Sequence, residues 1–298
     1  MDSSSASPLK LSIVVRCRGV ANGLAQLFEV LRAQTCDCGW ELIVVAETTA
    51  VAVQALCHQA SARLGCLPPD EFTDGRAHNL GIRDAAGELI LLLNADTVPI
   101  GSCFLERAMA PFSDPLMAAA RCLSVSNVAQ LGRWHQPKAI QYRSVAEQQH
   151  AERAAHWSDY PASACCVIRR SVWEQVPFDE NLEASEDKFW ASQVLARGFK
   201  IRSCAEALWL ANGHAAKREQ WETRHREQLG FYQFTGRRPL SWSAFLWQAT
   251  RSLVEAPLSA IRDAANEIAW NTRLLTIPRH ARRAAKVTAP HAPDRLRQ

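Results

Sequence analysis

Three short apolar runs separated by segments of helical periodicity constrain this chain's fold more than any other feature. Apolar side chains between the runs recur three or four residues apart, which is the spacing of an amphipathic helix. Strands that alternate with helices form parallel sheets with right-handed crossovers. The sequence therefore predicts an α/β fold with a Rossmann-like, mostly parallel sheet and flanking helices. The predicted strands are residues 11–15, 41–45 and 88–93, and the predicted helices are 22–34, 50–64 and 76–86.

The rest of the chain up to about residue 210 continues the pattern less regularly. The run at 88–93 is apolar enough to be a central strand, buried on both faces. Polar residues rich in Trp, His and Gln fill 127–160, where we expect a helix within a long excursion. The remaining predicted strands are 117–125, 164–168, 199–202 and 207–210, and the remaining helices are 102–112 and a short one around 172–174.

Polar side chains follow the predicted strands at their carboxyl ends. Open α/β sheets bind ligands beyond these ends. We therefore expect one crevice to contain Arg16, Arg18, Glu47, Asn94 and Asp96. The segment Asn-Ala-Asp-Thr at 94–97 also has a simpler interpretation as a turn or helix cap.

Two adjacent acids, Glu186 and Asp187, open a helix-like segment that is preceded by Ser185 and ends near Gly198. Acids in a first helical turn are favoured by the helix dipole and the unpaired backbone N–H groups, so a capped helix start explains them alone. Together with Asp96, however, they indicate a general base that faces a metal-bound leaving group.

Length and composition narrow the class of protein. The 298 residues suffice for one large domain, alone or with an appendage, and the net charge is only +4. A stripe of Lys and Arg interleaved with aromatics is missing before the C-terminus, which argues against nucleic-acid binding. The ten cysteines lack the paired spacing of zinc sites. Without a signal-peptide pattern or an apolar window of about 18 residues, we expect a cytoplasmic protein with reduced thiols.

The order of motifs resembles a known family, the inverting GT-A glycosyltransferases of family 2, including rhamnosyltransferase-like members. The resemblance runs from about residue 10 to about residue 235. It implies a GT-A domain over 10–235, with a nucleotide-sugar half (10–100) and an acceptor half (101–235), after a disordered leader (1–9). The motifs are LSIVVRCR, LRAQT, ELIVV, GRAHNLGIRDAAGELILLLNADTVP, VIRRSVWEQVPFDENLEASEDKFWASQVLARGFKI, NGH and KREQWETRHREQLG.

The resemblance also implies roles for individual residues. Asp187 corresponds to the general base. Glu186, the second catalytic residue, lies beside it and either bonds the acceptor or shapes the pocket, and Lys188 and Trp190 border the acceptor. Asp96 corresponds to a ligand of Mg²⁺ or Mn²⁺, and His214 completes the metal site. The residues implied to bind the nucleotide sugar are Arg16, Arg18, Glu47, Arg76, Asn79 and Asn94. Simpler interpretations remain for Arg76, as a solvated helix-start charge, and for His214, as an ordinary surface or core residue.

Two departures from the family pattern leave an alternative open. Ala46 stands where the second strand usually ends in an Asp, with Glu47 one place on, and Asn94 replaces the first acid of the Asp-X-Asp motif. The chain could therefore be a weak or inactive GT-A-fold subunit of a polysaccharide-assembly complex. A nucleotidyltransferase is a further alternative, although a Gly-rich phosphate loop is missing after the first strand.

The C-terminal part predicts a helical appendage over 236–286 and a disordered tail over 287–298. Residues 242–261 place apolar side chains on one helical face, interrupted by Pro257, and basic residues follow from Arg273 onward. This face either packs on the main domain or contacts an anionic membrane surface, at the inner face of the membrane. The expected partners are a nucleotide-diphosphate sugar and a glycan or lipid-linked acceptor.

Overall fold

The computed structural model describes residues 9–18, 23–47, 50–125 and 164–211, together with 226, 227, 229, 230 and 233. The chain divides into two compact units, Met1–Asn181 with Glu186–His214, and Leu182–Ser185 with Ala215–Gln298. The first unit contains the sheet and its helices. The excursion at 127–160, the appendage at 236–286 and His214 lie outside the described residues, so the predictions made for them stay predictions.

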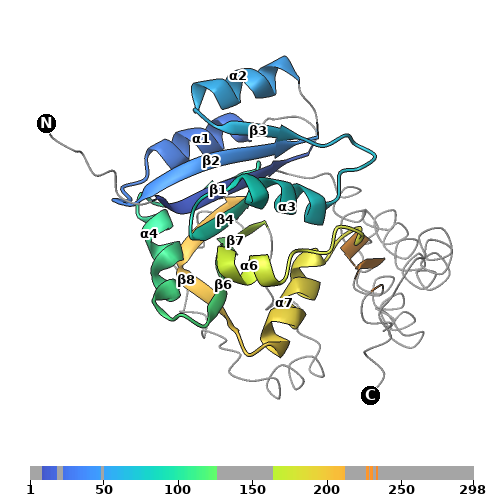
Figure 1. The fold of residues 1–298 in the computed structure, drawn as a ribbon. Coiled ribbons are helices and arrows are strands. Elements are labelled where there is room, and N and C mark those ends of the chain that lie inside the picture. The colour runs from blue at the N-terminus through green and yellow to red at the C-terminus, as the bar shows by residue number, and fades with distance from the viewer. Residues whose placement is uncertain are drawn as a thin grey trace, which may run out of the picture. The chain divides into compact units, whose positions relative to one another are not determined.

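The described strands form one mixed sheet in the order β3-β2-β1-β4-β7-β6-β8-β5. Figure 1 shows β3, β2, β1 and β4 following one another in this order. The first four strands in this order are parallel, as predicted, and β4 lies between β1 and β7. In contrast, β7 runs antiparallel to both β4 and β6, and β5 runs antiparallel to β8. The strands are β1 (Leu9–Cys17), β2 (Gly39–Ala46), β3 (Arg63–Cys66), β4 (Leu89–Asn94), β5 (Thr97–Pro99), β6 (Met117–Val125), β7 (Cys165–Arg169) and β8 (Lys200–Ala211).

Helices pack on both faces of the sheet because successive strand side chains point to opposite sides. On β1, Ile13 and Val15 belong to one core cluster with Leu27 of α1, whereas Val14 belongs to the other with Ile82 of α3. The first cluster includes side chains of α1 (Leu24–Arg32), α2 (Val51–Gln59) and α4 (Phe104–Met109), which is followed by the 3₁₀ helix η1 (Ala110–Ser113). The second cluster includes side chains of α3 (Asp74–Asp84), α6 (Arg170–Gln175) and α7 (Glu186–Ala196).

Three element predictions are wrong in detail. The end of the helix predicted over 50–64 is strand β3, and strand β5 was not predicted. Both strands are short, so neither carries a readable alternation of polar and apolar residues. The strands predicted at 199–202 and 207–210 are one strand, β8, whose pairing with β6 shifts register between Cys122 and Leu123. The residues of β8 that this shift leaves without a β6 partner, 205–207, include Glu206 and lie between the two predicted strands.

Helix α3 begins at Asp74, two residues before the predicted start. Thr73 is its N-cap, because the hydroxyl oxygen of Thr73 accepts a hydrogen bond of 3.2 Å from the backbone N–H of Arg76. A Cβ at position 81 would collide with the side chain of Val14, so Gly81 lets this helix lie close to β1. The cap and the close packing place the first turn of α3 beside the carboxyl end of β1.

Candidate active site

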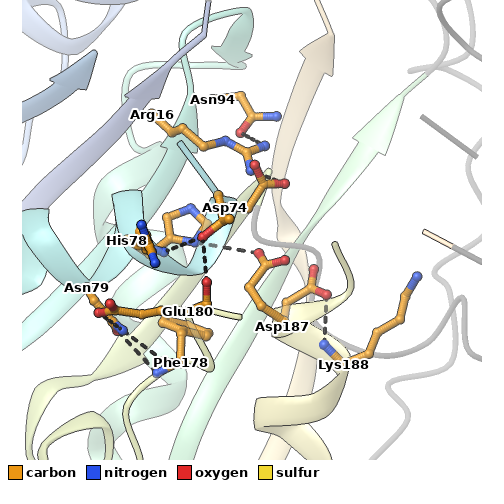
Figure 2. Close-up of polar contacts among 12 residues, drawn as sticks. Arg16, Asp74, His78, Asn79, Asn94, Phe178, Glu180, Asp187 and Lys188 are labelled. Atoms are coloured by element: carbon orange, nitrogen blue, oxygen red, sulfur yellow. Dashed lines mark hydrogen bonds and ion pairs between the residues drawn. The ribbon is translucent and has the colours of Figure 1, made fainter. Parts of the chain in front are cut away.

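Arg16 joins the carboxyl ends of two strands and the start of a helix (Figure 2). It is the register partner of Asn94 across β1 and β4, and its Nη2 donates a hydrogen bond of 2.8 Å to Oδ1 of Asn94. Its Nη1 forms an ion pair with Asp74 of α3. Burial alone would lower the pKa of Arg16, but the carboxylates of Asp74, Glu186 and Asp187 raise it. The guanidinium is therefore a permanent positive charge beyond these strand ends.

Asp74 is a site residue that the sequence analysis missed. Its side chain is 20% exposed and faces the guanidinium of Arg16. Burial would raise the pKa of Asp74, but the positive charges around it, Arg16 first, lower it. The sequence contains one usable signal, an Asp directly after Thr73 at a helix start, which indicates only a capped helix.

The two acids predicted as catalytic open α7, and they differ in exposure. Glu186 is buried, with 1% of its surface exposed, whereas Asp187 is half-buried and accepts a hydrogen bond of 2.7 Å from the backbone N–H of Lys188. Glu186 and Asp187 are both among the residues that raise the pKa of Arg16, so the start of α7 lies near the ends of β1 and β4. Figure 2 shows Asp187 and Lys188 projecting from α7 on this side.

Glu186 is packed against His78 of α3, a residue that the sequence analysis passed over. The imidazole is 0% exposed, and its Nδ1 lies 3.6 Å from Oε1 of Glu186. Burial, together with the charge of Arg16, lowers the pKa of His78 to about 3. Burial, together with the charges of Asp187 and Asp74, raises the pKa of Glu186 well above its ordinary value. Burial therefore favours the uncharged form of each member of this pair, a neutral imidazole and a protonated carboxyl group.

Asn79 does not line a cleft, so its prediction as a nucleotide-sugar ligand is wrong. It is 1% exposed, and its amide makes four hydrogen bonds of 2.9–3.1 Å. Its NH₂ donates to the carbonyl oxygen of Phe178 and to Glu180, while its Oδ1 accepts from the indole N–H of Trp173 and the backbone N–H of Phe178. Asn79 therefore uses its full hydrogen-bonding capacity to brace α3 against residues 173–180.

The structure also separates the residues predicted near the acceptor. Trp190 is 1% exposed in the core, and its indole N–H donates a hydrogen bond of 2.6 Å to the carbonyl oxygen of Val176, so its prediction as an acceptor contact is wrong. Glu186 is 1% exposed, so of its two predicted roles, bonding the acceptor or shaping the pocket, burial leaves the second. Lys188 is half-buried in the first turn of α7, where its prediction as an acceptor residue still stands.

A second group of predicted ligands lies where β1 and β2 end. Nη2 of Arg18 donates a hydrogen bond of 2.5 Å to the carbonyl oxygen of Phe72, and the guanidinium carbon lies 5.2 Å from the centre of the Phe72 ring. Glu47 is close by, with its Oε1 3.9 Å from Nε of Arg18. Nη1 of Arg76 lies 3.8 Å from Oε2 of Glu71. The structure thus brings Arg18 and Glu47 together, as expected for neighbouring strand ends.

Asp96 is an exposed carboxylate two residues beyond Asn94. Among the described residues, no group of three His, Cys, Asp or Glu side chains is close enough to hold a metal ion by itself. A single carboxylate is nevertheless compatible with Mg²⁺ or Mn²⁺, because such ions are commonly held by one or two carboxylates together with substrate phosphates and water. Asp96 could hold the ion in this way, whereas Oδ1 of Asn94 is already bonded to Arg16.

The cysteines and the helices bear on the predictions that were made from composition. Cys36 and Cys38 form a disulfide, which differs from the expected reduced thiols, and the other eight cysteines, all in the described ranges, are free. Within those same ranges, none of the helices combines the length and the apolar character needed to cross a membrane.

The fold matches that of known structures. Several solved glycosyltransferases share it, and their low sequence identity shows the fold alone. The mannosyltransferase PcManGT from Pyrobaculum calidifontis, in complex with GDP-Man and Mn²⁺, superposes with a TM-score of 0.56 at 15% identity, covering 96% of this chain and 79% of that one. TarS 1–349 of S. aureus in complex with UDP-GlcNAc gives a TM-score of 0.55 at 13% identity, covering 90% and 81%. The GT-A fold predicted from the sequence is confirmed.

The family follows from the sequence comparison. Residues 8–251 match the family model described as glycosyltransferase like family 2, and the chain belongs to this family. It is also 25% identical over 157 residues to the O-antigen chain rhamnosyltransferase RfbN of Salmonella typhimurium (strain LT2). That match covers 51% of this chain and 50% of RfbN, so the chain aligns with about half the length of this relative.

Proposed function

We propose that this protein transfers a sugar from a nucleotide-diphosphate donor to a hydroxyl group of a glycan or lipid-linked acceptor, with inversion and with a divalent cation. The observation that carries the proposal is the grouping of Arg16, Asn94 and Asp74 with the acidic start of α7 at the carboxyl ends of β1 and β4. Family membership supports it, as do the GDP-Man, UDP-GlcNAc and Mn²⁺ complexes of proteins with the same fold.

The donor's diphosphate leaves as a highly charged group, and this chain supplies positive charge where the strands end. The guanidinium of Arg16 is held by Asn94 and Asp74, so it can meet phosphate oxygens without first being ordered. Asp96 would hold Mg²⁺ or Mn²⁺, and the bound ion would neutralise the charge that develops on the diphosphate.

Asp187 is the better placed of the two acids to act as the general base. In an inverting transfer the acceptor oxygen bonds to the anomeric carbon as the bond from that carbon to the diphosphate oxygen breaks. The proton of the acceptor hydroxyl passes to a carboxylate on the face opposite the leaving group. Asp187 is half-buried and can meet an acceptor, whereas Glu186 is buried against His78.

The proposal is tested by a panel of nucleotide-diphosphate sugars with Mn²⁺, scored by thermal shift and by release of the nucleotide diphosphate in the presence of glycan acceptors. A donor should stabilise the folded protein, and Asp187→Asn should lower turnover by about 10²- to 10⁴-fold without weakening donor binding. Asp84→Asn, at an exposed position at the end of α3, is the control and should keep full turnover. Near-normal turnover of Asp187→Asn would remove Asp187 as the base.

A protein that no donor stabilises and that transfers no sugar would instead fit a non-catalytic subunit of a polysaccharide-assembly complex. The observation favouring this alternative is that Asn94, which lacks a negative charge, is bonded to Arg16.

A further inference from the structure

A buried His–Glu contact lies directly behind the proposed base. His78 on α3 and Glu186 on α7 are 0% and 1% exposed, and Nδ1 of His78 lies 3.6 Å from Oε1 of Glu186. Glu186 precedes Asp187 in the first turn of α7, so whatever fixes the side chain of Glu186 also fixes the backbone that carries Asp187.

Within the described part of the chain, the facing atoms of the two residues lack other hydrogen-bond partners. Both ring nitrogens of His78 and Oε1 of Glu186 are buried without one. A buried polar atom left unpaired is destabilising, so such atoms are nearly always paired in folded proteins. The present separation is roughly half an ångström longer than a hydrogen bond. A small rotation of the Glu186 carboxyl group would close it, as happens when catalytic sites tighten on substrate.

The surrounding charges determine which atom carries the proton. Arg16 of β1 opposes a positive charge on His78, whereas Asp74 of α3 favours one. Asp187 of α7 and Asp74 oppose a negative charge on Glu186, and Arg16 favours one. The thiol of Cys166 on β7 also faces these acids, and burial, with Asp187 and Glu186 among the further causes, raises its pKa, so it stays neutral. The arrangement places the proton on Glu186 and leaves the lone pair of Nδ1 on His78 as its acceptor.

We propose that His78 is a positioning residue for the transfer reaction: its Nδ1 accepts a hydrogen bond from the carboxyl group of Glu186, and this bond sets the orientation of Asp187. This inference rests on the proposed function. Glu186 and His78 together form a neutral support behind the site, next to the carboxyl group of Asp187. His78 itself touches neither donor nor acceptor, because it is fully buried.

The kinetic test compares two substitutions at position 78. His78→Leu keeps most of the side-chain volume but removes the hydrogen-bond acceptor Nδ1. His78→Asn keeps an acceptor, because the Oδ1 of the asparagine lies near the position of Nδ1. We expect His78→Leu to lower kcat by about 10- to 100-fold, as for a small misplacement of a reacting group, while KM for the donor is unchanged. His78→Asn should recover most of the loss. Equal loss in both variants would show that the ring only fills space, and unchanged kcat in His78→Leu would overturn the proposal.

A double-mutant cycle shows whether His78 acts through Glu186. When Glu186→Leu is already present, His78→Leu should lower kcat no further, because the interaction that it breaks has gone. Losses that multiply would mean that the two residues act independently, and the positioning role would be wrong. Thermal unfolding of each variant separates lost activity from lost folding.

A second measurement on the wild-type protein needs neither turnover nor a variant that folds. In protein labelled with ¹⁵N-histidine and with ¹³C at the glutamate carboxyl carbon, we expect His78 to stay neutral, with its proton on Nε2, and Glu186 to stay protonated from about pH 5 to about pH 8. A charged His78 or an ionised Glu186 in this range would overturn the proposal. If the wild-type protein transfers no sugar, the proposed function fails, whereas these spectra still decide whether the hydrogen bond exists.

Discussion

Nη2 of Arg16 donates a hydrogen bond of 2.8 Å to Oδ1 of Asn94, which joins two residues 78 positions apart at the ends of neighbouring strands. The resemblance of the sequence to the family predicts that Asn94 takes the place of the first acid of the Asp-X-Asp motif. The amide oxygen of Asn94 carries no negative charge. It therefore holds the guanidinium of Arg16 without acting as a second anion beside Asp74, the ion-pair partner of Arg16. The positive charge available to a diphosphate therefore depends on how this small network holds Arg16.

Arg16→Gln should destabilise the folded protein because it leaves the carboxylate of Asp74 without its cation. The side chains of Arg16 and Asp74 are 14% and 20% exposed. We therefore expect the free energy of unfolding to fall by about 3 kcal/mol, the lower end of the range for a broken buried ion pair. In the wild-type protein the pKa of Asp74 is lowered, so its stabilisation is present above the unfolded-state value of 3.8 and is lost as pH falls below it. Urea unfolding should therefore show a difference between the two proteins at neutral pH that narrows in acid. A difference that stays constant with pH would mean that the ion pair is not its source.

Asp96→Asn should remove the metal-dependent part of nucleotide binding, because the amide is a weaker ligand for a hard cation than the carboxylate. Titration calorimetry of a nucleotide diphosphate with and without Mn²⁺ measures this part directly. Asp70→Asn, at an exposed position between β3 and α3, is the matched control and should keep the effect of Mn²⁺. If wild-type affinity is the same with and without Mn²⁺, Asp96 is not a metal ligand.

Asn79→Ala should weaken folding and leave donor binding intact in the molecules that fold. The substitution leaves the indole N–H of Trp173 and the backbone N–H and carbonyl of Phe178 without their partner. We expect a loss of about 2–4 kcal/mol, since each buried group left unpaired costs about 1–3 kcal/mol and their effects overlap.

Urea unfolding measures how much stability Asn79→Ala loses. The control is Gln54→Ala, on the exposed side of α2, which should change the free energy of unfolding by no more than about 0.5 kcal/mol. A variant that folds normally and no longer binds the donor would restore the original interpretation of Asn79 as a ligand.

Glu186→Gln should become more stable relative to the wild-type protein as pH rises. The pKa of Glu186 is raised by burial and by the charges of Asp187 and Asp74, so the folded state keeps a proton that the unfolded state releases above about pH 4.5. The stabilisation from this group is therefore complete below that pH and is lost as pH rises through the folded-state pKa. The slope approaches about 1.4 kcal/mol per pH unit, and the amide has no proton to lose.

Denaturant unfolding of both proteins at a series of pH values tests this difference. If the stability of the two proteins changes in parallel above about pH 4.5, Glu186 ionises normally in the folded protein. The interpretation of His78 and Glu186 as a neutral pair would then be wrong.

The sequence by itself determined the main elements and the sheet edge at which Arg16 and Asn94 meet. Runs such as Leu89–Leu93 are apolar enough to be recognised as buried strands, and the residues after parallel strands meet at one sheet edge, so Arg16 and Asn94 were correctly expected together. The order of motifs was sufficient for the family and the GT-A fold. These features are read from neighbours in the chain, where periodicity and composition carry the information.

Only the tertiary structure decided what each polar side chain does. Asn79 braces a loop about one hundred residues away, Trp190 is in the core, and Asp74 and His78 became site residues through partners on β1 and α7. The antiparallel direction of β7 likewise follows from pairing with β4, not from its own residues. A side chain's burial and charge depend on segments that are distant in sequence, and a local pattern does not record which of them will pack against it.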